Sequence, residues 1–263
     1  VKDRAGQHGH NITSPHRAVN PNIQVIYNSY ISIVLLAGLW FNWPMTHSRE
    51  SDRIEHELRQ LILTLALEPG QAVSEAALMK RYGWGRTPLR EAFQRLAEQS
   101  LLQIIPHQGV IITPLSVFDF TAMMDAMAMV IGSAASLACQ RLSAADLDQL
   151  EQIVALSETA AEKRDFVTVA GQDYAFHRIL AEATGNSYLR DYLLRLHQSA
   201  TRFNFAAWQR DTVATPSMQE HHQIIAALRG RDPVQARQFM LAHVQNARAR
   251  VLGSAISDAE QFA

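Results

Sequence analysis

The segment that most constrains the fold is GWGRTPLREAFQRL, residues 83–96. Leu89, Phe93 and Leu96 recur at the i, i+4 and i+7 spacing of an amphipathic helix, so this face is predicted to be buried. Thr87 is expected to cap the helix, with Pro88 as its first helical residue. The polar side chains fall on the opposite face of the same helix: Arg86, Thr87, Arg90 and Gln94. The start of this helix therefore presents donors that suit phosphates and base edges.

The segments around this helix predict a winged helix-turn-helix over residues 51–115. An amphipathic helix follows Ser51, and a Pro-Gly turn then leads to a short helix capped by Ser74. After the basic helix, LLQII and VIIT are β-rich runs joined by the turn PHQG, which indicates a hairpin. Three helices followed by a hairpin are the parts of such a domain.

Charge is concentrated in this region. Residues 80–95 contain five basic side chains and one acidic side chain, Glu91, while the net charge of the whole chain is −1. A local basic patch is what phosphate attraction requires. The hairpin tip would add three residues near the groove: His107, Gln108 and Gly109. Taken alone, the basic helix also fits a solvated face of a generic bundle, but the order of elements favours binding to double-stranded DNA.

From Pro114 to about Leu252 the chain is predicted to be helical. Turn signals divide it into six helices, near residues 116–140, 144–162, 166–183, 187–208, 217–229 and 233–252, with a tail at 253–263. The predicted fold class is mainly α: an N-terminal winged helix-turn-helix followed by an all-α six-helix bundle over 116–252.

Four ionisable residues interrupt the apolar stripes of three bundle helices. By helical spacing, Asp173 and His177 lie on the core-facing stripe of one helix, His221 on that of a second and His243 on that of a third. A lone histidine on such a stripe is usually a satisfied core residue, and an unpaired carboxylate there is costly. One aspartate and three histidines together favour a site for a divalent transition metal, with zinc, nickel and manganese all compatible.

The segment LEPGQAVSEAALMKRYGWGRTPLREAFQRLAEQSLLQIIPHQGVIIT resembles the DNA-binding domain of GntR-superfamily regulators, and the helices after it resemble the FadR subfamily with its FCD effector domain. The resemblance covers residues 51–252 and implies a homodimeric regulator, commonly a repressor, that binds a pseudo-palindromic operator and responds to a small molecule. It assigns DNA contacts to Arg86, Thr87, Arg90, Gln108 and Gly109, and the metal to DYAFH, EHHQ and LAHV. Gly85 and Ala76 depart from the family pattern, so the operator sequence does not transfer.

The resemblance also implies an effector pocket in the bundle. Its expected residues are Asp125, Met127, His197 and Arg202. Relatives carry an arginine, which grips an effector carboxylate, where this chain has Met127. A carboxylate bound through the metal and a more apolar ligand therefore both remain open.

Residues 1–50 form a leader whose apolar core spans Ile31 to Trp43. This core is shorter than the roughly 20 residues of a membrane span, which favours an upstream or disordered extension over a membrane anchor or a partner-docking segment. The single cysteine, Cys139, fits a reducing cytoplasm. A metal-dependent enzyme is a further alternative, but EHHQ lacks the spacing of the His-Glu-x-x-His zinc motif and no nucleophile motif is present, so the chain is not expected to be an enzyme.

Overall fold

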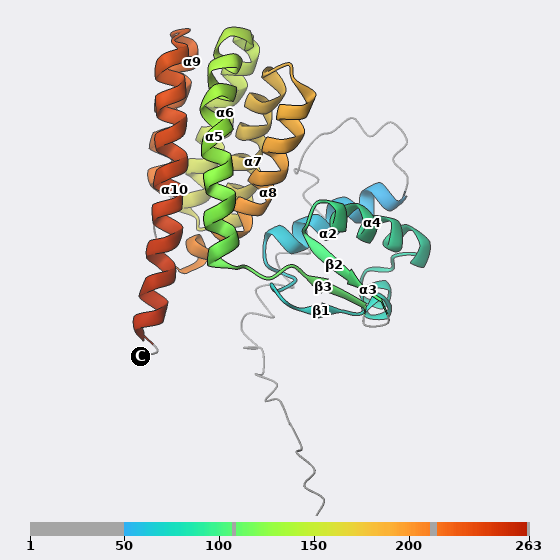
Figure 1. Ribbon diagram of the computed structural model, residues 1–263. Helices are drawn as coiled ribbons and strands as arrows, with labels where there is room; N and C mark the ends of the chain where they lie inside the picture. The colour runs from blue at the N-terminus through green and yellow to red at the C-terminus, as the bar shows by residue number, and fades with distance from the viewer. Residues whose placement is uncertain (1–49, 107–108, 211–214, 262–263) are drawn as a thin grey trace, which may run out of the picture. The chain divides into compact units, whose positions relative to one another are not determined.

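The structure, a computed structural model, describes residues 50–106, 109–210 and 215–261 (Figure 1). The leader predicted at 1–50 lies outside these residues except for its last position.

The N-terminal part of the described chain has the expected helices and hairpin, with one additional strand. Its elements are α2 (Glu50–Leu63), β1 (Ala72–Val73), α3 (Glu75–Tyr82), α4 (Arg86–Glu98), β2 (Leu102–Ile105) and β3 (Gly109–Ile112). The strands form an antiparallel sheet in the order β1-β3-β2, in which Leu102 faces Ile112 and Ala72 faces Ile111. The two-residue β1 was not predicted, because so short a run has no periodicity of its own and pairs only through β3.

The turn before α4 is built by two glycines. Gly83 ends α3 in the left-handed conformation, with a φ of 71°, where a side chain would be strained. Gly85 is the residue that caps α4, so the expected Thr87 cap is wrong: helix α4 begins at Arg86, two residues before the expected first helical residue, Pro88. Pro88 fits inside the first turn, because a backbone N–H at that place has no partner within the helix. Ser74 caps α3 as predicted and accepts a hydrogen bond from the N–H of Ala77.

Helix α4 is held by the face that its spacing predicted. Leu89, Phe93 and Leu96 are buried, and they belong to one apolar core with Ile54 and Leu58 of α2. The core extends to the sheet through further buried side chains: Leu102, Val110 and Ile112. Burial of this face fixes which side of α4 faces solvent.

The remainder of the described chain consists of six helices: α5 (Val117–Arg141), α6 (Ala144–Glu162), α7 (Phe166–Ala183), α8 (Ser187–Arg210), α9 (Thr215–Arg229) and α10 (Pro233–Gln261). The predicted fold class is therefore confirmed. Side-chain caps account for three of the helix starts, namely Ser116 for α5, Ser143 for α6 and Asp165 for α7. Helix α10 continues to Gln261, into the segment expected as a tail.

Helix α5 lies beside α10 along much of its length (Figure 1). Gly132 permits this approach, because a Cβ there would lie 3.0 Å from Arg237 Cγ and Leu241 Cγ. By length and composition, α5 is also the one helix in the described chain that could cross a membrane. It packs against α7, α8, α9 and α10, which is the environment of a core helix.

Candidate nucleic-acid interface and metal centre

The polar face of α4 is exposed throughout. Its side chains are those selected from the sequence: Arg86, Thr87, Arg90 and Gln94. A hollow lies between this face and the hairpin, and Arg90, Gln94 and Gly109 contribute to its lining. Gly109, with a φ of 99°, has a backbone conformation that suits glycine. His107 and Gln108, expected at the hairpin tip, lie outside the described residues.

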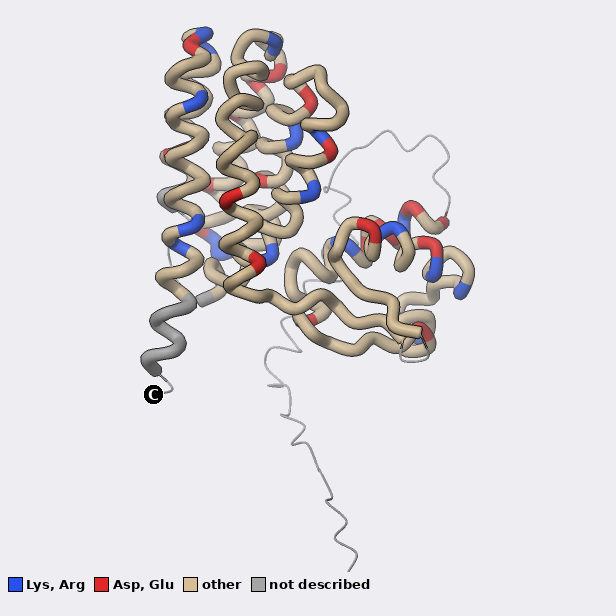
Figure 2. Tube along the Cα trace, viewed as in Figure 1, with Lys and Arg blue, Asp and Glu red and all other residues tan. Residues whose placement is uncertain are grey.

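Two of the arginines counted in the basic patch have acidic partners. Arg90 donates from Nε to both carboxylate oxygens of Glu75 at 3.0 Å. Arg95 pairs with Asp52 at 2.6 Å and Glu55 at 3.0 Å, both on α2, and so does not add to the exposed basic face. Figure 2 shows both signs of charge on the helices of this domain and none on β2 and β3. Arg90 is thus available to an anion only in competition with Glu75.

The second candidate site lies inside the helical bundle. The four selected residues, Asp173 and His177 on α7, His221 on α9 and His243 on α10, each offer one ligand atom, and these atoms lie within 4.8 Å of one another. All four side chains are buried. Asp173 Oδ1 is 3.6 Å from His221 Nε2 and 3.9 Å from His177 Nε2. The helical spacing thus predicted a true cluster.

His197 of α8 lies beside this cluster. Its Nε2 is 3.2 Å from Asp173 Oδ2, and its ring centroid is 4.2 Å from that of His177. Neither Asp173 Oδ2 nor His197 Nε2 makes a hydrogen bond of good geometry, and the buried Nε2 of His221 also has no hydrogen-bond partner. Buried polar atoms are normally satisfied, so a group of such atoms at one place fits the binding of an ion.

The protonation states suit a metal site. Burial lowers the pKa of His177 well below its usual value, with His197 adding to the effect, and burial and His243 lower the pKa of His221 to about 3. These imidazoles are therefore neutral at pH 7, which is the form that binds metals. Burial alone would raise the pKa of Asp173, but the histidines around it, His197 foremost, hold it well below its usual range. The cluster offers an anionic oxygen from Asp173 and neutral nitrogens from His177 and His221.

This donor set fits a divalent transition ion. Bonds of about 2.1 Å to nitrogen and oxygen place neighbouring ligand atoms roughly 3–4 Å apart, so small side-chain movements would bring the four atoms into range. Mixed imidazole and carboxylate ligands are common to several metals of the first transition row, and the residues do not select among zinc, nickel and manganese. Asp173, His177, His221 and His243 are the side chains that would hold the ion.

Sequence reasoning missed Glu220. This residue precedes His221 on α9, and its Oε2 lies 2.8 Å from His243 Nδ1. Burial opposes its ionisation, but hydrogen bonds from His243 and Arg250 lower the pKa of Glu220 to about 2. The available signal was the seven-residue spacing of His243 and Arg250, which places both on one side of α10.

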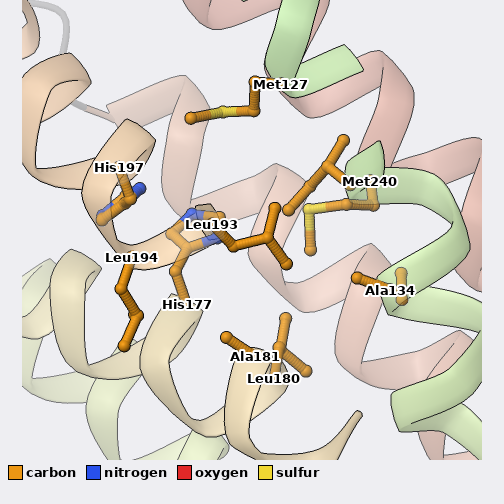
Figure 3. A pocket seen from close by; sticks show the side chains of 11 residues that line it. Met127, Ala134, His177, Leu180, Ala181, Leu193, Leu194, His197 and Met240 are labelled. Carbon is orange, nitrogen blue, oxygen red and sulfur yellow. The ribbon is translucent and has the colours of Figure 1, made fainter. Parts of the chain in front are cut away.

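A small apolar pocket lies next to the cluster, with room for about one water molecule. Figure 3 shows His177 and His197 on neighbouring helices, with Leu193, Met127 and Met240 around the same space. Two residues expected in the pocket, Met127 and His197, line it.

The other two expected pocket residues lie elsewhere, which corrects the sequence expectation. Asp125 is 61% exposed on the outer side of α5 and pairs with Arg248 at 2.6 Å. Arg202 is buried and donates to the backbone carbonyl of Thr113, and burial lowers its pKa to about 10. Helical periodicity explains Asp125: it lies one and two residues from the buried Met124 and Met127, about 100° and 200° away around the helix.

Comparison with known proteins identifies both parts of the chain. Residues 50–112 match the sequence profile described as bacterial regulatory proteins, gntR family, and residues 122–246 match the FCD domain. The transcriptional repressor RspR of Escherichia coli K12 is 26% identical over 197 residues, which cover 74% of this chain and 86% of RspR. A transcriptional regulator from the TAR-I ttuE-ttuC' intergenic region of Agrobacterium vitis is 33% identical, over 48% of this chain and 75% of its own length.

Solved structures show the same fold. E. coli McbR/YncC superposes with a TM-score of 0.73 at 19% identity, covering 80% of this chain and all of that chain. At that identity the likeness extends to the architecture alone.

The lowered pKa values of His177 and His221 predict a specific acid sensitivity of the metal-stripped protein. An unfolded histidine titrates near 6.5, whereas these two resist protonation in the folded state. Below pH 6.5 the unfolded state therefore binds more protons, and the free energy of unfolding falls as pH falls, by up to about 1.4 kcal/mol per pH unit for each histidine. Urea unfolding between pH 7 and about 5 measures this slope.

A neighbouring residue supplies the control for this slope. His221→Gln should make the pH dependence shallower, while Gln223→Ala, which changes a non-ionisable side chain at an exposed position on the same helix, should leave it unchanged. Equal slopes in the two variants would contradict the assignment.

Proposed function

Because this chain belongs to the gntR family of bacterial regulatory proteins and carries an FCD domain, we propose that it is a metal-containing, effector-responsive repressor that binds its operator as a homodimer. The chain is a DNA-binding transcriptional regulator and not an enzyme, in keeping with its relatives and its fold. The observation that carries the finer proposal is the buried cluster of Asp173 with three histidines in a bundle that follows a DNA-binding domain.

The exposed start of α4 is proposed to read DNA in the major groove. Arg86 and Arg90 project from its first two turns, where an inserted recognition helix contacts base edges. A bidentate arginine on guanine discriminates between bases, while Thr87 and Gln94 have donors and acceptors for phosphate or base contacts. The hairpin, with Gly109 and the tip residues His107 and Gln108, would contact the adjacent groove. Two such domains in a dimer would bind half-sites about one DNA turn apart.

Dimerisation through the bundle has one supporting feature. Phe118 and Met129 of α5 are 81% and 82% exposed, and their separation of eleven positions corresponds to about three helical turns, which places them on one side. Large apolar side chains exposed on one side of a helix are candidates for an interaction surface, and a second copy of this chain is the proposed occupant. A dimer that binds DNA in this way is proposed to act in the cytoplasm.

The bundle is proposed to hold the metal and to bind the effector beside it. A ligand reaching the ion would meet an apolar wall, since the pocket lining contains no arginine or lysine among the described residues. Asp125 and Arg202, the charged candidates, are committed to Arg248 and to Thr113. A second carboxylate or several hydroxyls would lose their hydrogen bonds to water without replacement. The proposed effector is therefore a small molecule with one metal-binding carboxylate and an apolar remainder.

The effector would act by binding one arrangement of the DNA-reading domains better than another. Its difference in affinity for the two arrangements sets how far it can shift the equilibrium between them. Met127 and Met240 are the side chains that can move to enlarge the pocket, because methionine has three flexible torsions.

Arg90→Ala should weaken operator binding by about 1–3 kcal/mol, or roughly 10–100-fold, because a direct groove contact is lost. Arg229→Ala is the matched control: Arg229 is also an exposed arginine in ion pairs, with Asp148 and Glu151, but lies on α9. Fluorescence anisotropy with an operator fragment at fixed salt measures both variants. Equal losses would place DNA binding elsewhere.

Asp173→Ala combined with His243→Ala should abolish stoichiometric metal binding, measured by elemental analysis of the purified protein. Loss of a ligand present at about 1,000 times its Kd removes about 4 kcal/mol of stability, which corresponds to roughly 10 °C in Tm. Asp125→Ala with His222→Ala changes the same residue types at exposed positions and should retain the metal. Unchanged metal content in the first double variant would refute the ligand set.

Monocarboxylates should stabilise the zinc-loaded protein more than dicarboxylates of equal chain length. Butanoate and pentanoate should raise Tm in a thermal-shift assay, whereas succinate and glutarate should not, because each would bury an unpaired second charge. Chelation of the metal should abolish the stabilisation. A larger shift with the dicarboxylates, or a shift that persists without metal, would contradict the proposed effector class.

A further inference from the structure

The carboxylate of Glu220 accepts hydrogen bonds from three residues of α10. Oε2 is 2.8 Å from His243 Nδ1, and Arg250 donates to Oε1 at 2.8 Å and to Oε2 at 3.1 Å. Asn246 Nδ2 donates to Oε1 at 2.9 Å. The side chain of Glu220 is only 15% exposed. Each carboxylate oxygen therefore has two partners, which fills the acceptor capacity of the group.

This arrangement selects one tautomer of a neutral His243 ring. An ionised carboxylate can only accept, so the proton between the two groups belongs to Nδ1 of His243. A neutral imidazole carries one N–H, which leaves Nε2 with its lone pair free. His243 packs against His221 and His177, with ring centroids 4.7 and 5.4 Å away. Nε2 is then the atom of His243 that remains for an ion in the cluster.

We propose that Glu220 is a positioning residue of the metal centre: it holds His243 with Nε2 as the ligand atom, while Arg250 and Asn246 hold Glu220 in place. The inference rests on the proposed metal site, to which it adds a residue that is not a ligand. Glu220 is excluded as a ligand itself because Arg250 and Asn246 occupy the oxygen not used by His243.

Arg250 completes the arrangement. Its guanidinium donates both to Glu220 and to Ser217 Oγ, at 3.0 Å, so it joins the first turns of α9 to α10. A carboxylate bound on two sides by a guanidinium keeps its orientation better than one held by a single contact. Hydrogen bonds from such outer residues typically change metal affinity by about 10–100-fold.

Replacement of Glu220 by glutamine separates this role from simple packing, because the side chain keeps its shape. If the amide oxygen faces His243, the NH2 group meets the donors of Arg250 and Asn246. If the NH2 group faces His243, it demands an acceptor at Nδ1 and drives the proton to Nε2, the ligand atom. Either orientation weakens the metal site.

The first experiment measures zinc affinity by competition with a chromophoric chelator. Glu220→Gln should bind zinc about 10–100-fold more weakly than the wild type, and Glu220→Asp should fall between them. Glu158→Gln is the matched control, since Glu158 pairs with His222 Nε2 at 2.9 Å in the same kind of contact on the bundle surface. An unchanged affinity in Glu220→Gln, or an equal loss in Glu158→Gln, would overturn the proposal.

The second experiment reads the tautomer directly in metal-free protein by ¹⁵N NMR of the histidine rings. His243 should carry its proton on Nδ1 in the wild type and shift toward the Nε2–H form in Glu220→Gln. Weaker zinc binding without this shift would show a merely structural role and overturn the proposal. If the wild type binds no zinc while the tautomer behaves as expected, the metal site fails and the Glu220–His243 contact stands.

Discussion

The packing of the helical bundle depends on one carboxylate that is buried among imidazoles. Asp173 lies in an apolar interior where an isolated charge would cost several kcal/mol, and its Oδ2 has no hydrogen bond of good geometry. Three helices, α7, α9 and α10, bring histidines to it, and α8 adds His197. Such an interior is stable as an apolar core only if something compensates the charge, and a divalent cation bound by these side chains would do so. Metal binding and the stability of the fold would thus depend on the same residues.

The sequence predicted both the two-part architecture and the cluster, because both depend on periodicity. The helical spacing of Leu89, Phe93 and Leu96 predicted the buried face of α4. The same spacing rule placed His221 inward, and in the structure His222 points to Glu158 at the surface. Helical periodicity does not predict which side chains of different helices contact one another. Glu220 was not selected from the sequence, because it is the packing of α9 on α10 that brings it to His243. The misplaced Thr87 cap has a local cause, since the start of α4 tolerates proline at more than one position.

The pocket beside the cluster has a different lining from the one that the family resemblance implies. Met127 stands where relatives are expected to carry an arginine, and the two remaining charged candidates serve structural contacts instead. The flexible thioether of Met127, in place of the expected arginine, makes this side of the pocket apolar and able to change shape. The metal would then be the only strongly polar feature available to a bound molecule.

The Glu75–Arg90 pair has a consequence for how salt affects the protein. Arg90 carries its own counter-charge, so in the proposed complex it would exchange the carboxylate of Glu75 for a phosphate of DNA. Glu75 remains close by and offsets part of the positive charge brought to the duplex. The number of small ions released per complex is then lower than a count of interfacial arginines implies. The domain would hold on to DNA over a wider range of ionic strength than its basic helix alone suggests.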